Sequence, residues 1–351
     1  MGYFSMQLER GVGRFIFTPY FGFRKFFNIG LLGAQFFLFR NSRIIGWPFK
    51  LSFDPSNICQ LQCPLCPTGR GQKGRSLGKM NFDNYKKIVE EMAPFLYEID
   101  LNNWGEPFLN SELVKMIEFA HRKRARTSVN TNLNVKFDDT MAESIVKSGL
   151  DVLYISMDGI SQETYEKYRV GGKLRIVWEN IRLVVEKKKE LKSKKPEIVW
   201  QFLVMKHNEH ELPLLEKTRQ ELGIDRLAIG GVRSDMGKEI FVNDDKKISS
   251  LEKWLPSKGE LSRYDFEKKQ RKNLKKTCAF LWFVSVINWN GSVSPCCANY
   301  NEKFDFGNAF ERGFKTVWNN EKYVSARKAV AKMQPNGKTV CDNCIRTGFI
   351  D

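Results

Sequence analysis

The sequence predicts an α/β fold: a partial (β/α)6 barrel with a small cysteine-bearing C-terminal domain and a Phe-rich helical N-terminal extension. Three observations support this prediction. Strand and helix patterns alternate about six times between residues 50 and 231, five of the eight cysteines follow residue 277, and nine Phe lie between positions 15 and 39. Such alternation implies a parallel sheet with crossover helices. Six units are too few for the eight of a closed barrel.

The predicted elements of the barrel follow in order. Strands are expected at 50–54, 98–103, 126–132, 151–158, 197–205 and 225–231. Helices, indicated by helical apolar spacing, are expected at 82–96, 111–123, 138–149, 162–169, 175–192 and 210–223. In parallel sheets of this kind, functional groups gather at the carboxyl ends of the strands.

The pattern changes after the sixth strand. The segment 232–277 is polar and charged, and 267–276 is predicted to be a solvated basic linker helix. Alternating apolar residues flank Asn290-Gly291, which predicts a β-hairpin within 283–300. A last helix is expected near 313–333. The predicted units are therefore 1–48 (extension), 49–231 (barrel), 232–277 (linker) and 278–351 (C-terminal domain).

The N-terminal extension raises the question of membrane contact. No acidic residue occurs between Arg10 and Phe53, and the net charge of the chain is +17, which favours anionic partners. The longest uncharged run, 26–39, has 14 residues, fewer than the roughly 17–20 that a spanning helix needs. A basic Phe-rich segment fits a helix lying in the interface of an anionic membrane. Packing over the open side of the barrel is the alternative.

Three cysteines follow the first predicted strand with the spacing C-x3-C-x2-C: Cys59, Cys63 and Cys66. Three thiolates can hold a [4Fe–4S] cube by three of its four irons, which leaves the fourth iron open to another ligand. A zinc site completed by a distant residue is the alternative, although the chain has only three His to contribute. Closely spaced thiolates imply a reducing compartment, so a cytoplasmic location is expected, with peripheral attachment to the inner face of the membrane as a further expectation.

Together with motifs after the later strands, this spacing resembles radical S-adenosylmethionine (SAM) enzymes of the SPASM/Twitch subgroup. Gly105, Glu106 and Pro107 after the second strand resemble the family segment that contacts the methionine amino group, and "SMDG" (156–159) ends the fourth strand. Leu65, before the third cysteine, departs from the Phe or Tyr that is frequent in the family. The resemblance covers residues 50–351.

The resemblance implies further site residues. Polar contacts to the methionine moiety and ribose of SAM are expected from Asn130, Asn132, Ser156 and Asp158. Arg169 is expected to pair with the methionine carboxylate, whose shape the guanidinium matches. One auxiliary [4Fe–4S] cluster is expected on Cys278, Cys296, Cys341 and Cys344, with a four-cysteine zinc ribbon as the alternative. Cys297 would replace Cys296, pack as a small hydrophobe, or face the substrate as a hydrogen-atom donor.

The implied reaction is reductive cleavage of SAM to a 5′-deoxyadenosyl radical, which abstracts hydrogen from an unactivated carbon. The basic, Phe-rich extension favours a lipid or lipid-linked substrate, modified by oxidation or C–C bond formation. The alternatives are a peptide or protein, although no peptide-recognition domain is evident before residue 50, and a soluble sugar or aminocyclitol dehydrogenation.

Partners follow from the same resemblance and from the charge. A reductant such as flavodoxin or ferredoxin and an anionic membrane surface are expected partners, and no specific nucleic acid is. An iron–sulfur electron carrier or a zinc-stabilised nucleic-acid binder would also explain the cysteines and the charge. Neither needs the motifs at 105–107 and 156–159, so the sequence favours an enzyme.

Overall fold

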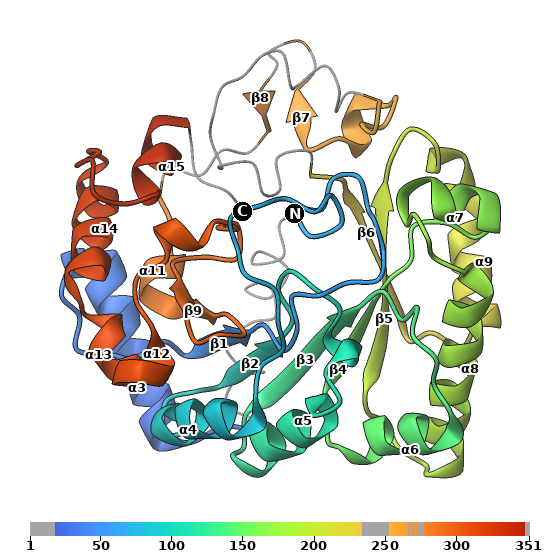
Figure 1. The fold of residues 1–351 in the computed structure, drawn as a ribbon, viewed down its shortest axis with the longest axis horizontal. Helices are drawn as coiled ribbons and strands as arrows, with labels where there is room; N and C mark the ends of the chain where they lie inside the picture. The colour runs from blue at the N-terminus through green and yellow to red at the C-terminus, as the bar shows by residue number, and fades with distance from the viewer. Residues whose placement is uncertain (1–17, 234–252, 266, 268–269, 273–276, 348–351) are drawn as a thin grey trace.

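The computed structural model describes residues 18–233, 253–265, 267, 270–272 and 277–347. Its centre is an eight-stranded sheet in the order β10-β9-β1-β2-β3-β4-β5-β6. The sheet curves without closing, and helices cover its outer face (Figure 1). The prediction of a partial barrel is therefore confirmed.

The six predicted barrel strands are present and parallel to one another. They are β1 Lys50–Phe53, β2 Glu98–Leu101, β3 Arg126–Thr131, β4 Val152–Ser156, β5 Glu197–Val204 and β6 Arg226–Gly231. The connecting helices are α4 Phe82–Met92, η2 Pro107–Leu109, α5 Leu113–Arg122, α6 Asp139–Lys147, α7 Gln162–Tyr168, α8 Leu174–Glu190, η3 Glu209–Leu214 and α9 Leu215–Glu221. Side chains cap several of these helices; Asn81, for example, accepts hydrogen bonds from the first N–H groups of α4.

The predicted hairpin is present, and it belongs to the same sheet as the barrel strands. β9 Val284–Ile287 pairs with β1 in parallel, and β10 Val293–Ser294 returns antiparallel. Gly291, in the turn between them, has a φ of 85°, which glycine adopts without strain. The remaining C-terminal elements are α11 Phe280–Phe283, η5 Glu302–Phe304, α12 Ala309–Arg312, α13 Phe314–Trp318, α14 Glu321–Lys332 and α15 Cys341–Thr347. The C-terminal region thus extends the barrel sheet by two strands.

Two predictions beyond the barrel need correction. The single helix predicted near 313–333 is two helices, because Asn320 interrupts it and caps α14 by accepting from the backbone N–H of Tyr323. In the linker, η4 Gly259–Leu261 precedes a separate two-stranded sheet of β7 Tyr264–Asp265 and β8 Gln270–Arg271. The helix predicted at 267–276 is therefore wrong at residues 270–271, which form β8. Most of the other residues of this segment lie outside the described part of the chain.

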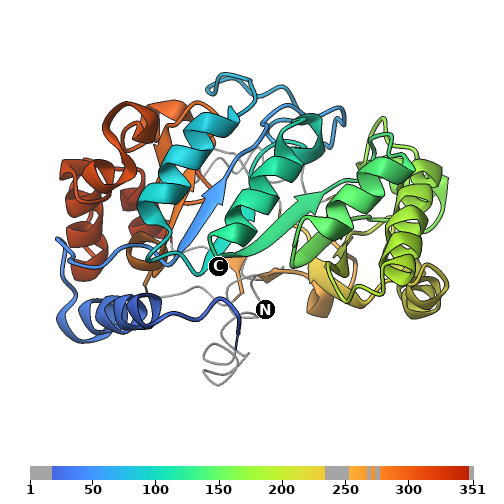
Figure 2. The same ribbon diagram turned by 90° about the horizontal axis from the view of Figure 1, so that it is seen from below.

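The N-terminal extension crosses the amino ends of the strands. It contains α3 Phe23–Ala34 and the π-helix η1 Gln35–Phe39. Lys25 Nζ donates to the carbonyl of Arg124, just before β3, at 2.7 Å. The Phe36 ring packs 5.1 Å from that of Trp282, just before β9. Figure 2 shows α3 at the opposite end of the sheet from the loop that follows β1.

Large apolar side chains of this extension face solvent. We call them the apolar face: Phe23, Phe26, Phe27, Phe37, Leu38, Phe39 and Ile45, each between 46% and 77% exposed. Arg24, Arg40 and Arg43 are exposed among them. Within the described ranges, no helix is long and apolar enough to span a bilayer. Residues 1–17, on which part of the membrane prediction rests, lie outside those ranges.

Candidate active site

The three clustered cysteines lie on the loop after β1, at the carboxyl edge of the sheet. The backbone N–H of Gln62 donates to the carbonyl of Val170 at 3.0 Å, which ties this loop to the segment after α7. Gly105 packs directly against the start of the loop, because a Cβ there would lie 2.0 Å from the carbonyl oxygen of Ser56. Gly105 therefore has a packing role that any side chain would disrupt.

Hydrogen-bond donors face two of the three sulfurs. Cys59 Sγ accepts from the backbone N–H of Leu61 and from Asn132 Nδ2, both at 3.5 Å. Arg169 Nη1 lies 3.9 Å from Cys63 Sγ. Burial raises the pKa of Cys59 to about 12, and it also raises the pKa of Cys63. Iron would have to displace the thiol protons, and the donors would then stabilise the thiolates, so these groups fit a cluster site.

Glu106 joins the ends of β2 and β3 and is 1% exposed. Its Oε1 accepts from Thr131 Oγ1 at 2.6 Å, and its Oε2 accepts from the backbone N–H of Asn132 at 2.8 Å. Burial raises the pKa of Glu106 to about 7, although these hydrogen bonds oppose the shift. Pro107 is buried at the start of η2. The structure therefore gives Glu106 a positioning role, since it orients the residue whose amide faces Cys59.

Asn130 and Ser156 form a polar layer with a residue that sequence reasoning missed. Ser156 Oγ donates to Asn130 Oδ1 at 2.9 Å, and Asn130 Nδ2 donates to Gln201 Oε1 at 2.8 Å. Gln201 lies opposite Ser156 in the register of β4 and β5. Its polar side chain between apolar neighbours on β5 was the available signal. Three adjacent strands thus place amide and hydroxyl groups side by side.

Asp158 and Arg169, which the sequence assigned to separate contacts, bind each other. Asp158 is 0% exposed, and its Oδ2 accepts from Arg169 Nε at 2.7 Å and Nη2 at 2.6 Å. Its Oδ1 accepts from the backbone N–H of Leu203 at 2.7 Å. The carboxylate raises the pKa of Arg169 well above its usual range against the opposing effect of burial. This geometry favours a positioning role for Asp158, which aims the guanidinium toward Cys63.

The predicted auxiliary ligands lie together in the C-terminal region, beside the edge of the sheet that β10 forms. Burial raises the pKa of Cys296 to about 12, and neighbouring Cys278 adds to the shift. Burial also raises the pKa of Cys341, and Cys296 and Cys278 contribute. Cys344 lies on the same helix, α15. Within the described part of the chain, no group of three or more Cys, His, Asp or Glu is arranged to hold a single metal ion.

Cys297 differs from its neighbour Cys296. Its side chain reaches solvent, although burial by surrounding protein atoms raises the pKa of its thiol, so its three alternative roles stay predictions. Arg233 and Lys50 oppose this shift, and Asp100 adds to it. Cys297 in turn raises the pKa of Cys296, so it lies near both the barrel strands and the auxiliary thiols.

An ion-pair network occupies the strand positions that face the barrel interior near the amino ends. Lys50 Nζ lies 2.9 Å from Glu98 Oε1 and 2.6 Å from Asp100 Oδ2. Arg126 Nη1 lies 3.4 Å from the other oxygen of Glu98. All these side chains are buried or nearly so. The network joins β1, β2 and β3 at the end of the sheet opposite the cysteine loop, which follows the carboxyl end of β1.

Three buried polar side chains at the carboxyl ends of β1 and β2 lack partners. Both oxygens of Asp54, Asn102 Oδ1 and Trp104 Nε1 have no hydrogen-bond partner among the described residues. The backbone N–H of Trp104 lies near Asp54, outside hydrogen-bonding geometry. Burial raises the pKa of Asp54 to about 7, with Arg75 opposing the shift. Since buried polar groups are normally paired, a ligand or ordered water is expected to complete this cluster.

The unpartnered cluster lies beside Tyr300 of the C-terminal region. The Trp104 ring packs edge-on against Tyr300, with 5.3 Å between ring centroids. Burial raises the pKa of the Tyr300 hydroxyl, and both Cys66 and Asp54 add to this shift. Sequence reasoning missed this cluster, and its only signal was an Asp directly after the first strand.

Comparisons with known proteins agree with this geometry. A model described as radical SAM superfamily matches residues 53–216, and one described as SPASM, an iron–sulfur cluster-binding domain, matches 278–345. A tungsten-containing aldehyde ferredoxin oxidoreductase cofactor-modifying protein of Pyrococcus furiosus is 25% identical over 301 residues, covering 78% of this chain and 82% of that protein. PqqA peptide cyclase of Granulibacter bethesdensis is 22% identical over 187 residues, covering 53% and 48%.

A solved structure shows the same fold. Streptococcus suis SuiB bound to S-adenosylmethionine superimposes with a TM-score of 0.59 at 14% identity, covering 85% of this chain and 72% of SuiB. Radical SAM enzymes bind a [4Fe–4S] cluster and SAM and need a reductant, and SPASM regions bind auxiliary iron–sulfur clusters. The chain is therefore a member of the radical SAM superfamily, an enzyme with a SPASM region.

Proposed function

We propose that this enzyme modifies a peptide or protein substrate at an unactivated carbon. When bound, the cluster and SAM supply the radical that removes the hydrogen atom. The observation that carries the proposal is the unpartnered cluster of Asp54, Asn102 and Trp104. Carboxylate and amide oxygens accept from peptide N–H groups, and the indole N–H donates to a peptide carbonyl. A hydrocarbon chain would leave all three unsatisfied, at a cost of about 1–3 kcal/mol for each buried group.

The relatives support a peptide over the lipid substrate that the sequence placed first. One is named a peptide cyclase and another a cofactor-modifying protein, and neither name refers to a lipid. The position of the apolar face points the same way, because it lies at the amino ends of the strands and the cysteine loop follows the carboxyl end of β1.

The proposal assigns the chain's own groups as follows. The ligands of the SAM-binding cluster are Cys59, Cys63 and Cys66, and those of one auxiliary cluster are Cys278, Cys296, Cys341 and Cys344. Arg169, held by Asp158, binds the methionine carboxylate of SAM. Asn130 and Ser156 face the ribose. A flavodoxin or ferredoxin supplies the electron.

A test compares substrates by the formation of 5′-deoxyadenosine. We expect a pool of random peptides to stimulate its formation by reduced holoenzyme, whereas vesicles of extracted lipid leave the rate unchanged. Asp54→Asn should lose at least about 10-fold of the peptide stimulation, because an NH2 donor replaces one of the two acceptor oxygens, and should retain basal SAM cleavage. The matched control is Asp83→Asn on the exposed start of α4. Stimulation by lipid but not by peptides would contradict the proposal.

Asp54→Asn should also stabilise the protein above neutral pH. Burial raises the pKa of Asp54 from its ordinary 3.8 to about 7. Ionisation is therefore disfavoured in the folded state, and this destabilisation grows as the pH rises from about 4 to 7. The amide removes it, so the free energy of unfolding should increase by on the order of 1–4 kcal/mol at pH 8 and by less at pH 5.5. Thermal unfolding at the two pH values checks this. An equal change at both would contradict the assignment.

We further propose that the enzyme attaches peripherally to anionic membranes through the apolar face. Exposed Phe residues interspersed with Arg24, Arg40 and Arg43 favour insertion at a lipid headgroup boundary. Full-length holoenzyme should co-sediment with phosphatidylglycerol vesicles more than with phosphatidylcholine vesicles. Replacing Phe27, Phe37 and Phe39 with Ser should lower the partition coefficient by at least about 10-fold, since each buried Phe contributes about 1.5–3 kcal/mol.

The control variant for membrane binding changes exposed apolar residues elsewhere. Leu214 on η3 and Ile229 on β6 are 51% and 52% exposed. Leu214→Ser/Ile229→Ser should leave co-sedimentation unchanged. A wild-type protein that stays in the supernatant with both vesicle types would overturn the attachment.

A further inference from the structure

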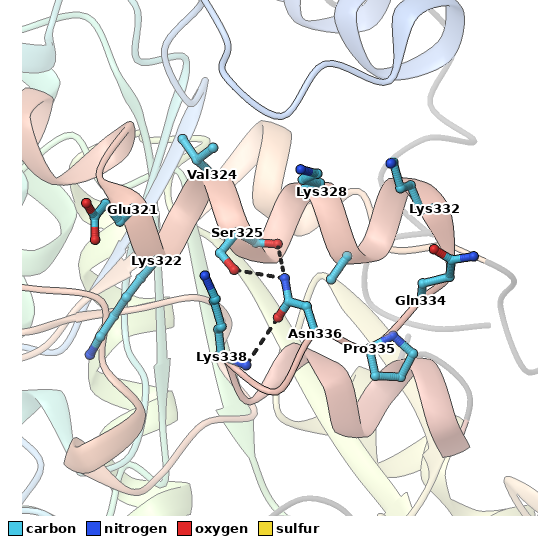
Figure 3. Close-up of a pocket in the computed structure, with 11 residues that line it drawn as sticks. Glu321, Lys322, Val324, Ser325, Lys328, Lys332, Gln334, Pro335, Asn336 and Lys338 are labelled. Atoms are coloured by element: carbon cyan, nitrogen blue, oxygen red, sulfur yellow. Dashed lines mark hydrogen bonds between the residues drawn. The ribbon is translucent and has the colours of Figure 1, made fainter.

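An open pocket of about 630 Å³ lies on the outer side of α14 (Figure 3). Four lysines line it, Lys322, Lys328, Lys332 and Lys338, against one acidic residue, Glu321. All four lysines are exposed. Lys322 Nζ donates to the carbonyl of Asp305, whereas no carboxylate of the described residues lies within ion-pair distance of the other three. The pocket therefore concentrates positive charge, and among the described residues three of its four lysines have no acidic partner.

The pocket has a built wall. Asn336 Nδ2 donates to Ser325 Oγ at 2.8 Å and to the carbonyl of Ser325 at 3.1 Å, and Asn336 Oδ1 accepts from the backbone N–H of Lys338 at 3.1 Å. Figure 3 shows the bonds from Asn336 to Ser325, which join the loop after α14 to the helix, and the bond between Asn336 and Lys338 within that loop. The shape of the pocket is thus defined by hydrogen bonds that do not involve the lysine side chains.

The loop that forms this wall is also hydrogen-bonded to the helix that carries two of the predicted auxiliary cysteines. The backbone N–H of Asn336 donates to Asp342 Oδ1 at 3.0 Å, and Asp342 follows Cys341 on α15. Tyr323 is buried on the inner face of α14. Burial raises the pKa of its hydroxyl, and both Cys341 and Cys296 add to this shift. One helix therefore separates the lysine pocket from the thiols of the auxiliary site.

We infer that this lysine pocket is the docking surface for an acidic one-electron carrier protein. The inference rests on the proposed function, because that function needs an external electron. Positive charge beside an iron–sulfur site complements the acidic surface of such a carrier and steers its approach. When bound, an iron–sulfur cluster of this chain would accept the one electron that the docked carrier loses, without proton transfer.

The test measures binding of a strongly acidic flavodoxin to full-length holoenzyme at low and high ionic strength. We expect Lys328→Glu/Lys332→Glu to raise the dissociation constant by at least about 10-fold at low salt, because charge reversal opposes docking. The control, Lys87→Glu/Lys189→Glu on α4 and α8, changes the net charge equally and should alter the dissociation constant by less than about 2-fold. Equal weakening by both double variants, or none by the pocket variant, would overturn the inference.

A second readout separates this inference from the proposed function. SAM cleavage driven by dithionite should be the same in wild type and pocket variant, whereas cleavage driven by reduced flavodoxin should fall in the pocket variant alone. Failure of the wild type with dithionite would contradict the function, and the binding comparison would still decide the docking surface. Equal flavodoxin-driven rates in both proteins would count against docking at this pocket.

Discussion

Replacing Cys63 with Ser is expected to remove about four of about eight irons per chain and to abolish SAM cleavage, because one of two [4Fe–4S] clusters loses a ligand. Cys63 is the buried thiol that Arg169 faces at 3.9 Å. Cys341→Ser is expected to remove the other four irons, since Cys341 neighbours Cys278 and Cys296 in the auxiliary site. Iron and sulfide counts after anaerobic reconstitution, with 5′-deoxyadenosine formation under dithionite, measure both effects.

The adjacent cysteines 296 and 297 supply a matched control. Cys296→Ser should lose the auxiliary irons, whereas Cys297→Ser should keep all of them, because Cys296 and Cys278, rather than Cys297, are the thiols that raise the pKa of Cys341. These two variants differ by one position and carry the same chemical change. If Cys297→Ser loses iron and Cys296→Ser does not, the assignment of the auxiliary ligands is wrong. Zinc in place of iron at this site would favour the zinc-ribbon alternative.

Local patterns explain which parts of the fold were predictable. Alternating apolar residues at 50–54 and a nearly continuous apolar run at 197–205 predicted β1 and β5, because both patterns are typical of strands that pack in a core. The cysteine loop was predictable because its spacing is a property of eight consecutive residues. Asn290-Gly291 predicted the hairpin for the same reason, since turn geometry depends on the two central residues.

Long-range pairing explains what was missed. β9 pairs with β1, more than two hundred positions away, and no local pattern selects that partner. Asp158 and Arg169 were each assigned a ligand, but a buried carboxylate needs a cation, and this one binds the arginine eleven positions later. The sequence could not show that both oxygens of Asp54 are buried without partners, because this depends on how the neighbouring strands and the C-terminal region pack around them.

Arg75 illustrates the same limit and leads to the largest expected effect on stability. In the sequence it belongs to a basic, glycine-rich segment typical of a solvated loop. In the structure its side chain is 0% exposed and pairs with Asp305 through two hydrogen bonds, at 2.9 and 3.0 Å. It also donates to the carbonyl of Tyr300 at 2.7 Å and to Ser292 and Ser294. Arg75 therefore fastens the segment after the cysteine loop to the hairpin of the C-terminal region.

Arg75→Met is expected to lower the free energy of unfolding by about 3–5 kcal/mol, because it leaves the carboxylate of Asp305 buried without its cation. Arg75→Met/Asp305→Asn should recover part of that loss, since the second change removes the uncompensated charge. The surface control is Arg175→Met, whose side chain is 78% exposed and pairs with Glu179 one turn along α8; it should cost at most about 0.5 kcal/mol.

Chemical unfolding of the four proteins, followed by tryptophan fluorescence, measures these differences. The arginine connects the cysteine loop to the C-terminal region, so the loss should be accompanied by easier release of iron from the auxiliary site to a chelator. Equal unfolding midpoints for Arg75→Met and Arg175→Met would show that the buried pair contributes no more than a surface pair. A double variant less stable than Arg75→Met would mean that the remaining hydrogen bonds to Asp305 need its charge even without the arginine. Their donors are Asn288, Ser294 and Asn299.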